Sequence, residues 1–339
     1  MPYGLPAWFV YTTVFIFGTS IGSFLNVIIW RMPRGESIVE PPSHCPSCNA
    51  RLTLIDLFPL LSYLFLRGKC RHCGAKISSR YFWIELLIGL WWLLIFWYVG
   101  VQQGMWIRTA GMLAFTTTLI AIFFIDLEHY EIPHELSLFA IFVGLGTDIW
   151  ALVAGEGSAL RLWHVHGVPI PGSVFGLFAG HVLFALIFIV SNIIYSRRMA
   201  DEEDETPAPA PGGSKIMAAL EWVLFVPFAW IMVIVDLIRA AIRKKKPEEL
   251  DDDTPAFGFG DVMLAAAIGA NLGLLRSGVG FFLALLIGTL VSLGLMAGKR
   301  KGLKSQVPFG PFLVAGAFLA IFFTSQIVNW YLTVSGLKP

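Results

Sequence analysis

Charged residues are what this sequence has least of. Only 14% of its 339 residues are charged and 56% are hydrophobic, whereas soluble domains are about a quarter charged. This deficit excludes an ordinary soluble domain and indicates a polytopic membrane protein. The formal net charge is only +1. With no basic amphipathic stripe and no recognition motif in the sequence, we expect no nucleic-acid partner.

Cysteine is also scarce, and all four cysteines lie in one short segment. Cys45 and Cys48 form one C-x-x-C pair, Cys70 and Cys73 form a second, and 21 residues separate the pairs. This spacing predicts a tetrahedral zinc site. Four thiolates fill the shell, so we expect a structural Zn²⁺ that stabilises a loop too small to hold a good core alone. Four free or redox-active thiols are the alternative.

Two further absences bear on targeting and cofactors. Residues 1–7 carry no positive charge, so we expect no cleavable signal peptide. Arg31 and Arg34 follow the first apolar run instead, which predicts an outer N-terminus and a cytoplasmic loop after that run. The sequence also has no Gly-rich Rossmann fingerprint.

Long apolar runs predict an all-α polytopic membrane protein of about eight transmembrane helices, with a small zinc-stapled cytoplasmic loop domain. The expected spans lie near 7–30, 82–100, 107–125, 135–154, 173–195, 262–275, 279–298 and 308–332. We expect domains at 1–30 (first helix), 31–81 (four-Cys zinc loop, methyltransferase-associated), 82–196 (helices carrying Asp126), 197–256 (cytoplasmic insertion) and 257–339 (helices carrying GFGD).

One more apolar stretch, 216–242, is not expected to cross. Basic residues stand on both of its sides, and Pro227 near its middle would break a helix. We therefore interpret it as re-entrant or interfacial. This topology places 20 of the 24 Lys and Arg in cytoplasmic segments and leaves Arg108, Arg161, Arg276 and Lys338 on the outer side of the membrane.

Two aspartates stand at the predicted cytoplasmic face. Asp126 ends the run 107–125, and Asp261 follows Gly258-Phe259-Gly260 at the start of a short span. Two carboxyls that share a site hold one proton between them. One can then activate water while the other polarises a peptide carbonyl, and Gly258 and Gly260 would let a substrate backbone come close. A helix end that simply reaches water is one alternative, and ion or proton coupling in a transporter is another.

The other polar residues near Asp126 have simpler interpretations. Glu128, Glu131 and Glu135 are expected to face water or cap the next helix. His129 falls three residues after Asp126, on the same helical face if the helix continues.

The small residues Gly269, Gly273, Gly280 and Gly288 are expected to allow close helix packing in lipid.

Several motifs in order resemble one family, the prepilin peptidases or type IV leader peptidases. The matching segments are GTSIGSFLNVIIWRMPRGES, SHCPSCNARL, PLLSYLFLRGKCRHCGAKISSRYFWIELL, FFIDLEHYEIPHELS, GFGD and VPFGPFLVAGA. The resemblance implies an aspartic endopeptidase of the G-x-G-D class with Asp126 and Asp261 as catalytic residues. It also implies a multi-pass protein of the bacterial inner membrane, with its active site at the cytoplasmic face.

The resemblance further implies substrates and a second activity. The substrates would be prepilins or pseudopilins, cut after a glycine that ends a basic leader, and the partners would include membrane lipid and the type IV pilus or type II secretion machinery. Methylation of the new N-terminus would use S-adenosylmethionine, whose contact residues the sequence does not identify. A transporter, an assembly factor with a zinc loop, and a methyltransferase with a degenerate peptidase site are the competing hypotheses.

The sequence departs from the family pattern in three places. His134 stands where the family usually has the aspartate of Leu-Pro-Asp, which makes Asp126 the firmer choice. Asp56-Leu57-Phe58-Pro59 replaces the usual Asp-Asn-Ile-Pro, and the segment 197–256 is extra.

Overall fold

The computed structural model describes residues 4–156, 163–165, 168–202, 258–297 and 307–336. The predicted re-entrant stretch 216–242 and most of the predicted insertion 197–256 lie outside the described residues. Helix α6 (Gly172–Glu202) continues past the predicted end of its span at 195, so its last turns fall within the predicted insertion.

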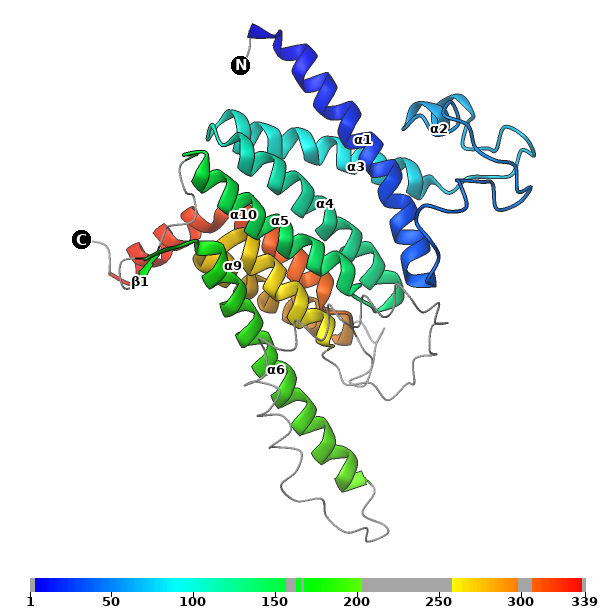
Figure 1. The fold of residues 1–339 in the computed structure, drawn as a ribbon. Coiled ribbons are helices and arrows are strands. Elements are labelled where there is room, and N and C mark those ends of the chain that lie inside the picture. The colour runs from blue at the N-terminus through cyan, green and yellow to red at the C-terminus, as the bar shows by residue number, and fades with distance from the viewer. Residues whose placement is uncertain (1–3, 157–162, 166–167, 203–257, 298–306, 337–339) are drawn as a thin grey trace. The chain divides into compact units, whose positions relative to one another are not determined.

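Helices make up most of the described chain (Figure 1). The long ones are α1 (Ala7–Arg31), α3 (Ser79–Ile95), α4 (Trp106–His129), α5 (His134–Val153), α6, α9 (Phe259–Ala297) and α10 (Gly310–Val334). Shorter elements are η2 (Met32–Arg34), α2 (Leu61–Phe65), the π-helical turn η3 (Phe96–Val101), and the antiparallel strands β1 (Trp163–Val165) and β2 (Val168–Ile170). Apart from this small hairpin, the all-α prediction is confirmed.

Seven helices of the described chain are long and apolar enough to cross a membrane, which makes this a multi-pass membrane protein. About eight were predicted. The difference arises in α9, which contains both predicted spans 262–275 and 279–298. Its backbone leaves the helical conformation at Gly273, with φ 71° and ψ 174°. A positive φ favours glycine, so Gly273 sets the place where the two halves of α9 meet.

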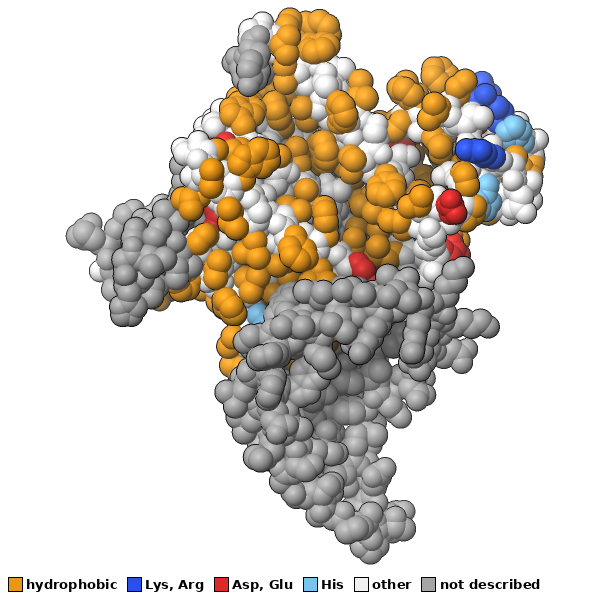
Figure 2. Space-filling model, in the orientation of Figure 1, with side chains coloured by type: hydrophobic (Ala, Val, Ile, Leu, Met, Phe, Trp, Pro, Cys, Tyr) orange, Lys and Arg blue, Asp and Glu red, His pale blue; other side chains and the backbone are white. Residues whose placement is uncertain are grey.

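Apolar side chains cover much of the visible surface of the described helices (Figure 2). Large exposed ones such as Trp8, Phe17 and Phe282 would meet water in a soluble protein. In a bilayer they meet lipid tails, which are as apolar as they are. Lys and Arg side chains gather instead on the segment that includes α2, between α1 and α3 (Figure 2).

The described chain forms two units, one of Met1–Glu131 with Gly146–Ala159, the other of Ile132–Leu145 with Leu160–Pro339. In the first unit, α1 packs closely against α3 (Figure 1). A Cβ on Gly22 would lie 2.8 Å from the Glu85 Cα, and one on Gly18 would lie 2.9 Å from the Trp92 Cβ. These glycines let the two helices approach closely in lipid.

In the second unit, α9 packs against α6 and α10. Glycine again sets the contact, since a Cβ on Gly269 would overlap the carbonyl oxygen of Gly176 on α6. A Cβ on Gly316 of α10 would overlap the carbonyl oxygen of Gly280. The predicted packing role is therefore confirmed for Gly269 and Gly280.

We expect Gly269→Ala to destabilise the protein, because the added methyl group meets backbone that cannot move aside. Overpacking of this kind costs about 1–3 kcal/mol. Gly278→Ala is the matched control in the same helix, since nothing lies within 4 Å of the position that its Cβ would take, and alanine favours a helix. Thermal unfolding in detergent should show a lower midpoint for Gly269→Ala alone. Equal midpoints for both variants would contradict the packing role of Gly269.

A buried ion pair joins α4 to the last part of α5 within the first unit. The Arg108 Nη2 lies 2.6 Å from the Asp148 Oδ1, and both side chains are buried. The Glu156 carboxylate accepts the backbone N–H groups of Ile107 and Arg108 at 2.9 and 3.1 Å. Glu156 thus caps the N-terminus of α4, where free N–H groups attract an anion.

We expect Asp148→Leu to lower stability by about 3–5 kcal/mol, because it leaves Arg108 buried and unpaired. The double variant Arg108→Leu/Asp148→Leu should recover most of this loss, since no buried charge remains. Thermal unfolding of the two variants in detergent measures the difference. A double variant less stable than Asp148→Leu would show that the pair itself is strongly stabilising.

Candidate catalytic and metal-binding residues

The two C-x-x-C pairs fold into matching turns. The Asn49 N–H donates to the Cys45 carbonyl oxygen at 2.8 Å, and the Gly74 N–H donates to the Cys70 carbonyl oxygen at 2.9 Å. Asn49 and Gly74, each directly after the second cysteine of its pair, have φ of 54° and 72°. Asparagine and glycine tolerate this left-handed conformation best. Each turn therefore directs both of its sulfur atoms to one side.

The four thiols come together, as the spacing predicts. All four Sγ atoms lie within 4.8 Å of one another, and the Sγ atoms of Cys45 and Cys73 are 3.9 Å apart. A tetrahedral ion with metal–sulfur bonds of about 2.3 Å would place its ligands about 3.8 Å apart. Cys45 and Cys70 are buried, while Cys48 and Cys73 are exposed. The cluster has the size and donor set for a metal ion, and the ligand role itself stays a prediction.

The thiols differ in acidity. Backbone hydrogen bonds from Ser47 and then Cys48 lower the pKa of Cys45 to about 6. The hydrogen bond with the Ala75 backbone lowers the pKa of Cys73, but partial desolvation of the sulfur and hydrogen bonds with the neighbouring thiols outweigh it and raise this pKa to about 11. Metal binding deprotonates every thiol that it uses, so an ion would make the four sulfur atoms electrostatically alike.

An acid in the loop between the two cysteine pairs contacts the second cysteine turn. The Arg71 Nε lies 2.9 Å from the Asp56 Oδ1 in an ion pair, and Arg71 lies between the cysteines of the second pair. The Thr53 hydroxyl and then the Thr53 backbone N–H lower the pKa of Asp56 through hydrogen bonds to Oδ2. Asp56 begins the segment that departs from the family pattern, yet its carboxylate orders this loop.

A buried carboxylate on α3 attaches the cysteine-bearing segment between α1 and α3 to that helix, and a buried amide on α1 joins α1 to α3. The Glu85 carboxylate on α3 accepts the Leu60 backbone N–H at 2.8 Å. The Asn26 side chain on α1 donates to the Tyr81 carbonyl oxygen at 3.2 Å. Sequence analysis did not single out either residue, although a carboxylate inside an apolar run such as 82–100 was an available signal.

Asp126 lies inside α4 and is buried, with 5% of its surface exposed. The helix was predicted to end at Asp126 but continues to His129. It stops at Tyr130, which has φ 56° and donates its N–H to the Asp126 carbonyl oxygen at 3.0 Å. Burial argues against a helix end that simply reaches water, because an aspartate is almost never fully buried unless it is paired.

Asp261 stands in the first turn of α9 and is also buried, with 7% of its surface exposed. Its Oδ2 accepts the Gly258 N–H at 3.1 Å, and its own N–H donates to the Gly258 carbonyl oxygen at 3.2 Å. This reciprocal pattern resembles a capping box and fixes the carboxylate at the helix start. The turn that begins at Gly258 therefore sets the direction of the Asp261 side chain.

The two glycines of this motif differ in their surroundings. A Cβ on Gly260 would lie 2.8 Å from the Ile132 Cβ, so Gly260 allows close packing of the protein on itself. A Cβ on Gly258 would meet nothing closer than 3.8 Å. Gly258 thus has space beside it, while the predicted role of both glycines toward a substrate stays a prediction.

Asp126 belongs to the first unit and Asp261 to the second. That they share one site stays a prediction. Within the second unit, Ile132 packs on Gly260, and the rings of His134 and Phe259 lie 5.7 Å apart. Ile132 is only six residues after Asp126 in the chain. A short peptide connection therefore joins the helix of the first aspartate to the segment that packs on the motif of the second.

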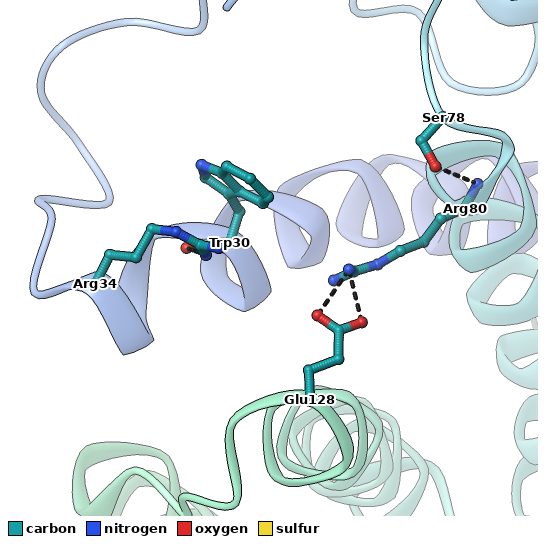
Figure 3. A network of polar contacts seen from close by, with 5 residues as sticks. All are labelled: Trp30, Arg34, Ser78, Arg80 and Glu128. Carbon is teal, nitrogen blue, oxygen red and sulfur yellow. Dashed lines mark hydrogen bonds and ion pairs between the residues drawn. The ribbon is translucent and has the colours of Figure 1, made fainter. Parts of the chain in front are cut away.

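Glu128, two residues after Asp126, forms an ion pair with Arg80. The Arg80 Nη1 lies 2.7 and 2.8 Å from the two Glu128 carboxylate oxygens (Figure 3). Arg80 is in the first turn of α3, where Ser78 caps the helix by accepting the Arg80 N–H at 3.3 Å. Glu128 is exposed as expected, but its pairing with Arg80 was not foreseen.

The other polar residues that directly follow Asp126 are exposed or half-buried. Glu131 and Glu135 are exposed, and Glu135 lies in the first turn of α5, as expected for a capping acid. His129 is half-buried on the last turn of α4. At the end of the first helix, the guanidinium of Arg34 on η2 lies 3.7 Å from the centre of the Trp30 ring on α1 (Figure 3). Such cation–aromatic pairs are typical of membrane interfaces.

Comparison with known proteins gives two family matches. Residues 16–99 match the Bacterial Peptidase A24 N-terminal domain, and residues 113–293 match the Type IV leader peptidase family. The first range includes all four cysteines, and the second includes Asp126 and Asp261. No solved structure matches the chain.

Curated relatives match this chain over nearly their whole length or over a part of it. A protein of Aeromonas hydrophila is 28% identical over 98% of this chain and 97% of its own. One of Bacillus subtilis (strain 168) is 25% identical over 95% and 98% of the respective chains. One of Myxococcus xanthus (strain DK1622) is 39% identical over 39% of this chain and 38% of its own. Each carries the name "Prepilin leader peptidase/N-methyltransferase".

Proposed function

Because this chain belongs to the type IV leader peptidase family, we propose that it is a membrane-embedded aspartic endopeptidase that removes the basic leader of prepilins or pseudopilins after a glycine. The observation that carries the proposal is the burial of Asp126 and Asp261, each near the end of an apolar helix and each inside the matched range. Intramembrane carboxylates are costly and mark functional sites.

In this proposal the two aspartates act as one catalytic pair. Two carboxyls that share a site hold a single proton, because both cannot ionise easily at short distance. The ionised one takes a proton from water, and the protonated one donates a hydrogen bond to the scissile carbonyl. The Gly258 turn fixes the direction of the Asp261 carboxylate, and the short connection between Asp126 and Ile132 supports a common site.

We place the site at the cytoplasmic face of the bacterial inner membrane. Arg31 and Arg34 follow the first helix, and basic side chains gather on the cysteine segment between α1 and α3, as the positive-inside rule expects of cytoplasmic loops. The apolar helix of the substrate would enter from the lipid, while the leader's charges stay in water. The pilus or secretion machinery would then receive the mature subunit.

The names of the relatives support a second activity, methylation of the new N-terminus with S-adenosylmethionine. We associate it with residues 31–81, where Cys45, Cys48, Cys70 and Cys73 would hold a structural Zn²⁺. Four cysteine ligands leave no open position for catalysis. The ion's contribution would therefore be to order this segment, and the Asp56–Arg71 and Glu85–Leu60 contacts would hold it in register with α3.

A cleavage assay tests the proposal. Purified protein in detergent is mixed with a prepilin that carries its leader, with and without S-adenosylmethionine, and the products are read by intact mass. We expect loss of the leader in both samples and a further gain of one methyl group only with the methyl donor. An uncut prepilin beside folded enzyme would contradict the peptidase, and the transporter hypothesis would then be preferred.

A further inference from the structure

Glu128 is the acid nearest to Asp126 along α4, and its carboxylate forms an ion pair with the guanidinium of Arg80. Arg80 contacts both of its oxygens, yet the side chains of Arg80 and Glu128 remain 30% and 36% exposed (Figure 3). Both residues belong to the first unit. The pair thus shows that this carboxylate accepts a cation from a second segment of the chain while it stays open to water.

The surroundings of Glu128 favour a cation. It lies in the last turn of α4, where the helix dipole presents its negative end. Asp126 and the exposed Glu131 lie within three residues on either side. Among the described residues, Arg80 is the cation that pairs with Glu128. A mobile ammonium or guanidinium that approaches this end of α4 therefore meets an attractive field.

Stability alone is a poor explanation for the pair. Partly exposed ion pairs contribute little to folding, because water and salt screen them and because two long side chains must be ordered. The α1–α3 contact and the buried Asn26 and Glu85 already attach the start of α3. Another cation can therefore replace Arg80 at Glu128 with little loss of free energy. The buried Arg108–Asp148 pair does not allow such an exchange.

We propose that Glu128 is the carboxylate that binds a basic side chain of the substrate leader, and that Arg80 occupies it until the substrate arrives. This inference rests on the proposed function and names a specificity-determining residue for it. The leader's cation would take the place of the Arg80 guanidinium, so that Glu128 holds the leader two residues from Asp126. Arg80 would then compete with the substrate for Glu128.

Substitutions of Glu128 and of Arg80 should have opposite effects on KM. Glu128→Gln should raise KM for a basic leader about five-fold, the size expected for one partly exposed pair, with kcat unchanged. Arg80→Met keeps the apolar stem but removes the competitor, so it should lower KM about two-fold, the smaller end of the same range. Glu135→Gln removes the same charge from an exposed acid seven residues away, in the first turn of α5, and is the control, with KM as in the wild type.

Substrates with altered leaders complete the test. KM is measured for a prepilin and for versions in which each basic leader residue is replaced by glutamine. One such version should raise the wild-type KM and make Glu128→Gln indistinguishable from wild type. If Glu128→Gln and Arg80→Met raise KM or lower kcat alike, the pair is structural and the inference is overturned. A wild-type enzyme that cuts no prepilin would overturn the proposed function, and this inference with it.

Discussion

Asp126→Asn and Asp261→Asn should each reduce prepilin cleavage between about 10² and 10⁴-fold, the range that a positioned acid or base contributes. Asparagine keeps the size of the side chain but cannot take or give the proton. In the proposed mechanism the two carboxyls act on one water and one carbonyl, so neither can replace the other. Initial rates are measured from the intact mass of the product in detergent, with Glu135→Gln as a control that removes an exposed acid.

The geometry at Asp261 allows chemistry to be separated from folding. The Asn side-chain oxygen in Asp261→Asn can still accept the Gly258 N–H, so this variant should unfold at the wild-type temperature. Asp261→Ala loses the cap as well, which costs about 1 kcal/mol. Both variants should be inactive, and only the alanine variant should be less stable. Substantial cleavage by either asparagine variant would contradict the catalytic pair.

Replacement of a buried cysteine should have the largest structural effect. We expect about one zinc ion per chain in the wild-type protein and none in Cys45→Ser or Cys70→Ser, because three thiolates and a hydroxyl hold zinc poorly. Binding energies of structural zinc reach about 10–16 kcal/mol, so residues 31–81 should lose their fold. Metal analysis and limited proteolysis of the purified variants measure both effects.

The matched control for this experiment is Ser47→Ala, which changes a residue between Cys45 and Cys48 and keeps all four ligands. Because the chain has no other cysteine, thiol titration gives an independent reading. Chelation should expose four reactive thiols in the wild type. Metal-free wild-type protein with an intact, protease-resistant loop would contradict a structural zinc site.

Most of the helix positions could be predicted from the lengths of the apolar runs in the sequence. The runs near 7–30 and 135–154 correspond to α1 and α5 within one residue at either end, because a membrane helix must be apolar throughout. The break in α9 was less predictable. The sequence placed it between 275 and 279, whereas it lies at Gly273, and hydropathy cannot distinguish a glycine that packs from a glycine that turns.

Side-chain pairing was the weakest part of the sequence interpretation. The cysteine cluster was predictable, because two C-x-x-C turns constrain four sulfur atoms locally. The Arg80–Glu128 and Arg108–Asp148 pairs join residues 48 and 40 positions apart, and only helix packing decides such partners. The topology prediction placed Arg108 on the outer side of the membrane without a partner, and the structure places it in a buried ion pair on α4.

The most direct test of the central claim measures whether Asp126 and Asp261 share one site. Asp126→Cys/Asp261→Cys, in zinc-loaded protein whose native thiols are protected by the metal, is treated with a short bifunctional thiol reagent and mapped by peptide mass. The account predicts a 126–261 crosslink in the double variant, and none in either single variant. Absence of that link, although each new cysteine reacts with a monofunctional reagent, would contradict a shared catalytic site.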